Sequence, residues 1–299
     1  MEVLSMEIRV LKYFLAVARE ESITRAAESL HLSQPTLSRQ LKDLEDELGT
    51  VLFIREPRRV LLTEQGQILR KRAEEILALV DKAESEIKAD FDGVSGDVYI
   101  GAGETRCGHI LTRAAARMKS QHPDIRIHII SGDTVDVLEQ LDKGLIDFGL
   151  LFNPVDLTKY NVLPIHDKDI WGVLMRRDCP LARLDSISPA DLNGLPLIVS
   201  RQSRDGDVFS SWFHMPLNAL NIAATYTLSY NASLMVEDGI GYGLCLDGII
   251  NTSGASALTY RPLSPTLTAG MNVLWKKHQL LSRAAQCYLE ALKAELYTQ

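Results

Sequence analysis

Residues 22–41 read SITRAAESLHLSQPTLSRQL, and this stretch decides the fold of the amino-terminal part of the chain. Ser22 is suited to cap a short helix, because its hydroxyl can accept a hydrogen bond from the free N–H groups of a first turn. The small side chains of Ala26 and Ala27 allow a neighbouring helix to approach closely. A turn over residues 31–33 follows, so the sequence predicts two helices joined by a tight turn.

The second helix is predicted over residues 34–48, where leucines recur at spacings of four, three and four residues and Gly49 stops the pattern. These spacings place the apolar side chains on one stripe of an α-helix. The stripe consists of Leu37, Leu41, Leu44 and Leu48. The opposite face carries no acidic residue in its first half, as expected of a helix whose first turns enter a DNA groove. An ordinary solvated helix face is the alternative.

Polar side chains at the start of this helix have the chemistry of base recognition. The Gln34 amide can pair with adenine in a bidentate manner, and the Arg39 guanidinium can read guanine or hold a phosphate. The hydroxyls of Thr36 and Ser38 can reach base edges or a thymine methyl group.

Residues 51–62 predict a wing. Two short apolar strands, 51–55 and 60–62, flank a polar turn that contains Pro57. Three arginines against one glutamate at positions 55–59 make this turn basic, which suits the phosphate backbone or the minor groove.

A long helix is predicted from a cap at Thr63 to about residue 91, which makes it about 42 Å long at 1.5 Å per residue. Apolar residues recur along it at heptad spacing. They are Leu69, Ala73, Ile76, Val80, Ala83 and Ile87. Because this seam would be wet in a monomer, it predicts a dimerisation helix. Packing of the helix against the chain's own domain is the alternative.

Strand and helix patterns alternate from Gly93 onward, after a short joint rich in glycine and serine. This alternation is typical of α/β lobes built on a parallel sheet. Strands are expected at 97–101, 125–130, 145–152, 170–175, 195–200, 223–228, 242–246 and 271–275, and helices at 109–121, 135–143, 208–213, 232–238 and from 282.

Length, composition and charge exclude several classes of protein. The 299 residues favour two or three domains, and 46% hydrophobic with 24% charged residues is the composition of a soluble globular protein. A net charge of −7 excludes a protein that coats nucleic acid along its whole surface. Charges scattered through the first thirty residues exclude a signal peptide, and no apolar run is long enough for a membrane span. Met6 is a second candidate for the natural start.

The remaining reactive side chains favour no other chemistry. Four cysteines without a Cys-x-x-Cys pair exclude a zinc knuckle and a disulfide framework, and a reducing cytoplasm fits them best. The histidines between residues 109 and 128 fit no zinc motif. Minor alternatives are a redox pair and a hydrolase without a nucleophile elbow. The residues concerned are Cys179 and Cys245 for the first, and Ser200, Ser203 and His214 for the second.

Taken together, these features resemble the LysR-type transcriptional regulators. In the first third, the resemblance rests on Phe14, residues 22–27, Leu30, residues 32–41, Leu44-Glu45, Leu48-Gly49, Leu52-Phe53, Arg55, Arg58 and Leu62-Thr63. Further along, GLIDFG at 144–149 and GIGYGL at 239–244 match family landmarks in the expected order. The resemblance covers essentially the whole chain.

The resemblance implies a multidomain α and α/β protein. We expect a winged helix-turn-helix DNA-binding domain at 6–63, a linker or dimerisation helix at 64–92, and an effector-binding domain at 93–299. The last would consist of two α/β lobes like those of periplasmic binding proteins. Lobe I is expected at about 93–163 and 266–299, and lobe II at about 164–265.

The resemblance also carries roles to individual positions. The residues expected at DNA are Arg25, Ser33, Gln34, Pro35, Thr36, Ser38, Arg39, Arg55 and Arg58, with the last two on the backbone. Effectors are expected at strand carboxyl ends and helix amino termini, where free N–H groups favour anions. The residues expected there are Glu104, Thr105, Arg106, Ser131, Asp133, Phe152, Gln202 and Ser203. A simple strand-to-helix turn and an Arg106–Glu104 surface pair are the alternatives for residues 101–106.

The expected function is therefore a cytoplasmic, homodimeric or homotetrameric transcription regulator. It would bind double-stranded promoter DNA at an interrupted inverted repeat and be switched by a small-molecule effector, for which Arg106 suggests an anion. RNA polymerase is a further expected partner; no catalysis, cofactor, metal or membrane is expected. The alternative is a two-lobed small-molecule binding protein or enzyme without specific DNA binding.

Overall fold

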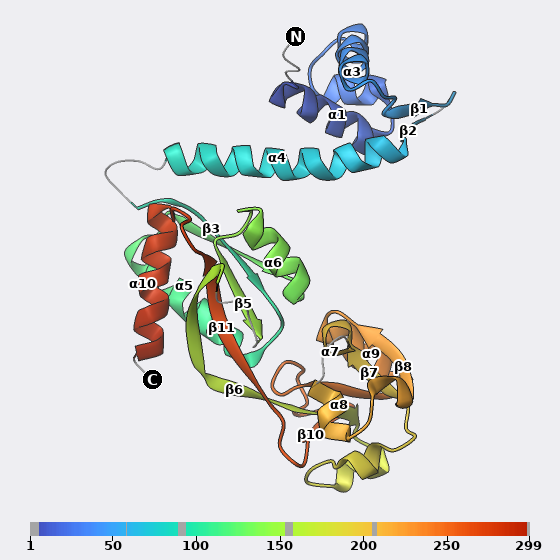
Figure 1. The fold of residues 1–299 in the computed structure, drawn as a ribbon, viewed down its shortest axis with the longest axis vertical. Helices are drawn as coiled ribbons and strands as arrows, with labels where there is room; N and C mark the ends of the chain where they lie inside the picture. The colour runs from blue at the N-terminus through green and yellow to red at the C-terminus, as the bar shows by residue number, and fades with distance from the viewer. Residues whose placement is uncertain (1–5, 58, 89–93, 153–157, 205–207, 298–299) are drawn as a thin grey trace. The chain divides into compact units, whose positions relative to one another are not determined.

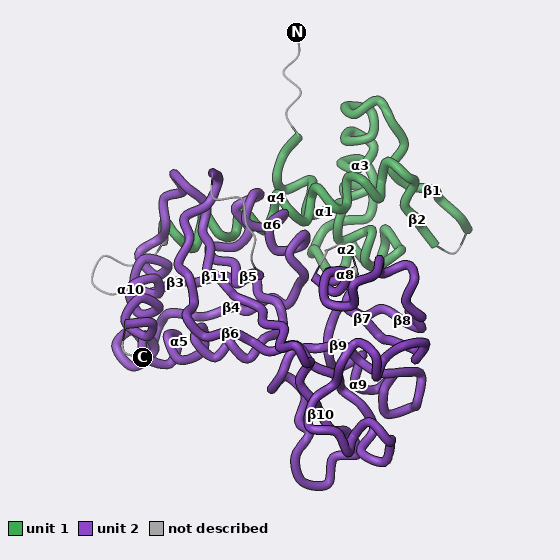
Figure 2. Tube along the Cα trace, turned by 60° about the horizontal axis from the view of Figure 1, so that its bottom comes forward, with its two compact units in different colours: residues 1–88 green, residues 89–299 purple. Residues whose placement is uncertain are grey.

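The computed structural model describes residues 6–57, 59–88, 94–152, 158–204 and 208–297. The chain divides into two compact units, residues 1–88 and 89–299, which Figure 2 distinguishes by colour. Each unit is built around its own hydrophobic core.

The first unit is a helical module with a two-stranded wing (Figure 1). Its elements are α1 (Ile8–Glu20), α2 (Ile23–Ser29), α3 (Gln34–Leu48), β1 (Phe53–Arg55), β2 (Val60–Leu62) and α4 (Glu64–Lys88). The prediction for residues 34–48 is confirmed residue for residue, because Ser33 caps the start of α3 and Gly49, at φ 63°, ends it. Ser22 caps α2 by accepting a hydrogen bond from the backbone N–H of Arg25.

Helix α3 buries its leucine stripe against α1 and α2. Leu37, Leu41 and Leu44 are buried with Phe14, whose ring packs at 5.2 Å from that of Phe53. The fourth predicted member of the stripe, Leu48, is 38% exposed. The prediction is wrong there because Leu48 is the last residue of the helix and lies at the edge of this core.

The wing is tied to α3 by one carboxylate. Glu45 accepts hydrogen bonds from the backbone N–H groups of Leu52 and Phe53, at 2.7 and 3.1 Å. Strands β1 and β2 then pair antiparallel, with Phe53 opposite Leu62. Strand β1 begins two residues later than predicted, because residues 51 and 52 approach the wing before the ladder starts.

Helix α4 packs its first half against the first unit's own core. Thr63 caps it as predicted, since its hydroxyl accepts the backbone N–H of Gly66 at 3.0 Å. Ala73 is fully buried, and Leu69 and Ile76 pack against the same core. The prediction of one dimerisation seam is therefore wrong for these three positions, which α1 and the wing already cover.

The second half of α4 and its outer face are not covered by the core of the first unit. Apolar side chains remain exposed there within the described unit: Ile68 at 60%, Leu79 at 39% and Ile87 at 82%. These side chains have area available for burial against a partner.

The described residues of the second unit form a nine-stranded mixed sheet with helices packed on it. Its strands are β3 (Gly96–Ala102), β4 (Ile125–Ser131), β5 (Phe148–Phe152), β6 (Tyr160–Arg176), β7 (Leu197–Ser200), β8 (Ile222–Tyr226), β9 (Tyr242–Leu246), β10 (Leu258–Pro262) and β11 (Thr268–Lys276). Its α-helices are α5 (His109–Gln121), α6 (Thr134–Asp142), α7 (Arg201–Arg204), α8 (Val208–Phe213), α9 (Ser229–Glu237) and α10 (Arg283–Tyr297). Short 3-10 helices lie at Arg106–Gly108, Pro180–Arg183, Pro189–Leu192 and Leu217–Ala219.

The strand order is β4-β3-β5-β11-β6-β9-β7-β8, with β10 paired to β6. The predicted parallel pairing is present in β4-β3-β5 and in β8-β7-β9. It is wrong for β11 and β6, which pair antiparallel with each other and with their neighbours. Strand β6 also begins ten residues before the predicted 170–175, and β10 and α7 were not predicted.

Strands β6 and β11 connect two lobes, each with its own core (Figure 1). One core gathers around Phe148 and Tyr288 beneath α5 and α10. The other gathers around Phe209 and Trp212 on α8. The carboxyl ends of β3, β4 and β7 therefore lie where the two lobes meet, since contacts between residues 104, 133 and 134 and residues 201, 202 and 229 cross there.

The close approach of α4 to the wing gives a stability prediction. A Cβ atom at Gly66 would lie 2.3 Å from the backbone oxygen of Leu52, so Gly66→Ala forces the backbone apart. We expect the free energy of unfolding of the first unit to fall by about 1–3 kcal/mol, the usual cost of overpacking. The measurement is urea unfolding of the full chain followed by helical circular dichroism.

The neighbouring exposed position supplies the control, because Gln67→Ala creates no contact and should leave the transition in place. All three tryptophans, Trp171, Trp212 and Trp275, belong to the second unit, so the tryptophan fluorescence transition should not move. Equal unfolding midpoints for Gly66→Ala and Gln67→Ala would contradict the prediction.

Candidate functional site

Two surfaces carry functional side chains, and the first is the start of α3. Gln34, Pro35, Thr36 and Arg39 are exposed and Ser38 is half-buried. Pro35 occupies the first turn, where a missing backbone N–H costs nothing. The first turns of α3 therefore present polar side chains and no carboxylate to the solvent.

Internal hydrogen bonds already hold several of these side chains. The hydroxyls of Ser33 and Thr36 lie 2.8 Å apart, and Ser33 also accepts the backbone N–H of Thr36 at 3.3 Å. Arg25 donates to the backbone oxygen of Glu20 and so ties α2 to the end of α1. These contacts orient the turn between α2 and α3 and leave Gln34 as an exposed side chain at its apex.

The arginines of the first unit differ in how firmly ion pairs within the protein hold their side chains. Arg39 lies 3.9 Å from Asp43, but the two side chains are 84% and 58% exposed, so the pair is weak and open to exchange for a phosphate. Arg59 Nε donates a hydrogen bond to the Glu56 carboxylate at 2.8 Å, and this bond raises the pKa of Arg59. Arg55 is exposed on β1. Arg58, also expected on the DNA backbone, lies outside the described residues.

The second surface is a cavity of about 760 Å³ in the second unit. Its lining contains both apolar and polar side chains. The apolar lining residues include Phe152, Trp171, Val208, Leu246, Ile249 and Ala269. The polar lining residues include Glu104, Asp133, Thr134, Ser200, Arg201, Gln202, Ser203, Thr227 and Ser229. A cavity of this size and mixed character suits a small organic ligand.

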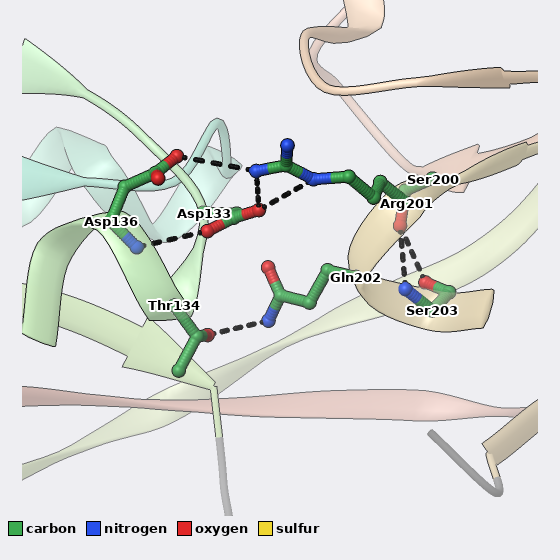
Figure 3. A network of polar contacts seen from close by, with 7 residues as sticks. All are labelled: Asp133, Thr134, Asp136, Ser200, Arg201, Gln202 and Ser203. Atoms are coloured by element: carbon green, nitrogen blue, oxygen red, sulfur yellow. Dashed lines mark hydrogen bonds and ion pairs between the residues drawn. The ribbon is translucent and has the colours of Figure 1, made fainter. Parts of the chain in front are cut away.

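The side chains of Arg201 and Gln202 join the lobes beside the cavity (Figure 3). Arg201 Nε donates to Asp133 at 3.0 Å, and its Nη2 lies 3.4 Å from Asp136. Gln202 Nε2 donates to the Thr134 hydroxyl at 2.6 Å. The start of α6 and the short helix α7 are thus held together by side chains alone.

The environment of Asp133 keeps this carboxylate ionised. Burial opposes its charge, but hydrogen bonds from Arg201 and from the backbone N–H of Asp136 outweigh burial and lower the pKa of Asp133. Asp133 is also the cap of α6, where the helix dipole favours a negative charge. The Arg201–Asp133 contact is therefore an ion pair at neutral pH.

The cavity includes five of the eight residues expected from the sequence: Glu104, Asp133, Phe152, Gln202 and Ser203. Thr105, Arg106 and Ser131 are not among the described residues that line it. Thr105 instead donates to Asp169 and accepts the backbone N–H of Cys107. Arg106 turns away to Asp247 at 3.2 Å, which also replaces the surface pair with Glu104 considered above.

Sequence reasoning missed several cavity residues, chiefly Arg201, Thr134, Trp171 and Ser229. Arg201 directly follows β7, so the rule that ligands meet strand carboxyl ends could have found it. Trp171 lies within β6, whose length was not predicted.

Comparison with known proteins decides the family. Residues 8–67 match the family described as "Bacterial regulatory helix-turn-helix protein, lysR family", and residues 91–296 match the "LysR substrate binding domain". The chain belongs to the LysR family. It is a LysR-type transcriptional regulator with a DNA-binding helix-turn-helix domain and an effector-binding domain.

Individual relatives agree with this assignment. The chain is 30% identical over 281 residues to the Hca operon transcriptional activator HcaR of Escherichia coli K12, covering 92% of this chain and 93% of that protein. It is 31% identical over 194 residues to the DNA-binding transcriptional dual regulator OxyR of the same strain, covering 65% and 63%. The fold is similar to that of full-length CbnR in complex with its target DNA, with a TM-score of 0.77 at 20% identity over 97% of this chain and all of that one.

The described residues offer little for other chemistry. Among them, no group of histidine, cysteine and carboxylate side chains could hold a metal ion. No helix in the described ranges is long and apolar enough to cross a bilayer. All four cysteines are free thiols.

Burial makes two of these thiols, Cys107 and Cys245, unreactive. It raises the pKa of Cys107 to about 12, with the nearby Asp169 carboxylate adding to the effect, and it raises the pKa of Cys245 to about 12 as well. Both groups are therefore neutral thiols at pH 7.5, and a neutral thiol is a poor nucleophile toward alkylating agents and peroxide.

We therefore expect iodoacetamide at pH 7.5 to modify Cys179 and Cys287, which are half-buried, well before Cys107 and Cys245. Mass spectrometry of tryptic peptides measures the four rates. Urea-unfolded protein is the control, in which all four should react alike. Modification of either buried thiol of the folded protein as fast as Cys287 would contradict the expectation.

Proposed function

We propose that this LysR-type regulator reads promoter DNA with the first turns of α3, holds the backbone with its wing, and responds to a small molecule in the cavity of its second unit. The observation that carries the DNA part is the exposed, acid-free start of α3 on a capped helix-turn-helix. Because its ligand is promoter DNA, the proposed place of action is the cytoplasm.

In this proposal each side chain at the DNA has a separate task. Gln34, Thr36 and Ser38 face base edges, with Pro35 setting the start of the helix. Arg39 can leave its weak pair with Asp43 for guanine or phosphate. Ser33 and Arg25 act by orienting the turn. Arg55, together with the expected Arg58, contacts the backbone.

A second copy of the chain is the proposed partner of α4. The exposed side chains of Ile68, Leu79 and Ile87 would be buried in a dimer, or in a tetramer built from dimers. Two reading modules related by a twofold axis then require an interrupted inverted repeat in the DNA. RNA polymerase is a further proposed partner at the promoter.

The proposed switch is a linkage between ligand and lobe arrangement. The contacts that close the cavity, Arg201 to Asp133 and Gln202 to Thr134, join the lobes through side chains. A ligand that fits one arrangement better shifts the population toward it, without any chemical step. Glu104, Phe152 and Ser203 are the other predicted residues that line this proposed effector site.

Two variants test whether base recognition and backbone contact belong to different residues. We expect Gln34→Ala to lose discrimination between the protein's own upstream region and random duplex, because a base-edge contact disappears. Arg55→Ala should weaken binding to both duplexes alike and reduce its salt dependence. Titrations of full-length protein against labelled duplex, with random competitor and varied salt, measure both effects; we expect the Gln34 variant to lose about 1–3 kcal/mol of discrimination.

Lys159→Ala is the matched control, because it removes one exposed positive charge from the second unit. It should leave both affinities unchanged. Equal losses on specific and random duplex for the Gln34 and Arg55 variants would refute the assignment of base reading to Gln34. Wild-type binding that vanished with competitor would refute specific binding itself.

A further inference from the structure

The charge of the effector cavity is not balanced among the lining residues that the structure describes. Its charged members there are Glu104, Asp133 and Arg201. The Arg201 guanidinium is already held between the carboxylates of Asp133 and Asp136. The negative charge of Glu104 therefore has no matching cation in the described wall.

Glu104 occupies the place where an anionic ligand would be expected. One of its oxygens, Oε2, accepts the backbone N–H of Ser229, the first residue of α9. A helix amino terminus favours an anion there, and the chain supplies its own carboxylate from the other lobe. A ligand carboxylate would have to displace Glu104 or lie beside it.

The second oxygen of Glu104 is left for a ligand. Within the described part of the chain, no side chain or backbone group donates a hydrogen bond to Oε1. Glu104 is half-buried, so the oxygen is neither sealed in the core nor fully hydrated. A carboxylate in this position attracts an N–H donor, and a charged donor most strongly.

The sequence predicted an anionic effector from Arg106, and the geometry argues for the opposite charge. Arg106 pairs with Asp247 and is not among the described lining residues. The cation that does line the cavity, Arg201, is already paired with two carboxylates, and their negative charge opposes an anionic ligand at this position.

The apolar residues that line the cavity define the rest of the ligand. The rings of Phe152 and Trp171 and the aliphatic side chains of Leu246 and Ile249 line the same cavity. Trp171 packs edge-on at 4.9 Å against Phe209, which fixes its orientation. An apolar body, preferably an aromatic ring, would bury its surface there.

We propose that the cavity binds an organic cation, an ammonium group on an aromatic or aliphatic body, with Glu104 as the residue that selects the charge. This inference rests on the proposed effector role of the cavity and names its ligand class. Ser203 and Thr134 also line the cavity, and their hydroxyls are further hydrogen-bond partners for the ligand.

Three probes with one shared body test the ligand class: 3-phenylpropylammonium, 3-phenylpropanol and 3-phenylpropanoate. Titration calorimetry on the full-length protein should rank the ammonium first, about tenfold above the alcohol, as one charge-assisted hydrogen bond implies. The propanoate should bind most weakly. Glu104→Gln keeps an oxygen that can accept the Ser229 N–H and removes the charge, so it should bring the ammonium down to the affinity of the alcohol.

Two controls accompany this variant. Glu290→Gln makes the same change of charge at an exposed position on α10 and should leave the ranking unchanged. Gly103→Leu places a larger side chain in the cavity, from a Cβ position 3.8 Å from the Phe152 ring, and should weaken all three probes.

Tighter binding of the propanoate, an unchanged ranking in Glu104→Gln, or no binding of any probe would each overturn the proposal. The same samples are titrated with the protein's own upstream duplex against random competitor. Intact discrimination alongside a failed ranking would discard the ligand class and keep the regulator. Lost discrimination in the wild type would discard the proposed function itself.

Discussion

The antiparallel pairing of β6 with β11 is the constraint on which the effector-binding unit depends. These two strands pass from one lobe to the other, and their ladder shifts register between Gly270 and Asn272. Asp169, fully buried on β6 beside this shift, accepts hydrogen bonds from Thr105 and from the Cys107 thiol. The buried carboxylate thus fixes the end of β3 to the crossing strands. Removing these two donors would leave a buried acceptor without a hydrogen bond, which costs about 1–3 kcal/mol.

Away from the crossing strands, two of the contacts between the lobes beside the cavity, Arg201–Asp133 and Gln202–Thr134, join side chain to side chain, whereas Glu104 accepts the backbone N–H of Ser229. The Arg201 guanidinium is 51% exposed, and an ion pair with such exposure is worth about 0–1 kcal/mol. The Gln202–Thr134 hydrogen bond adds a similar net amount. Where two long paired strands connect the lobes and the side-chain contacts at the margin are weak, a ligand of moderate affinity can shift the lobes.

How far the sequence predicts this structure depends on the range of the interactions. Helices α3, α5 and α8 and strand β9 match their predicted bounds, because caps, glycines and apolar spacing act within a few residues. The first ten residues of β6 have no such local signal, since their pairing partner in β11 is about a hundred residues away. The range of the interactions also limits how far the cavity residues can be predicted. The family resemblance nominated Glu104 and Gln202, which do line the cavity. The contacts of Thr105 with Asp169 and of Arg106 with Asp247 depend on long-range register.

Glu104 shows why motif position alone does not give a ligand's charge. The turn after β3 points toward the helix amino termini of the opposite lobe, which argues for an anion as long as the turn itself is neutral. In this chain the turn carries a carboxylate that reaches Ser229 and uses that favourable position internally. The carboxylate of Glu104 thus lies at the positive end of the α9 helix dipole, so that position is already occupied before any ligand enters. The oxygen left for the ligand is Oε1 of the Glu104 carboxylate. A ligand complementary to this oxygen must carry a hydrogen-bond donor.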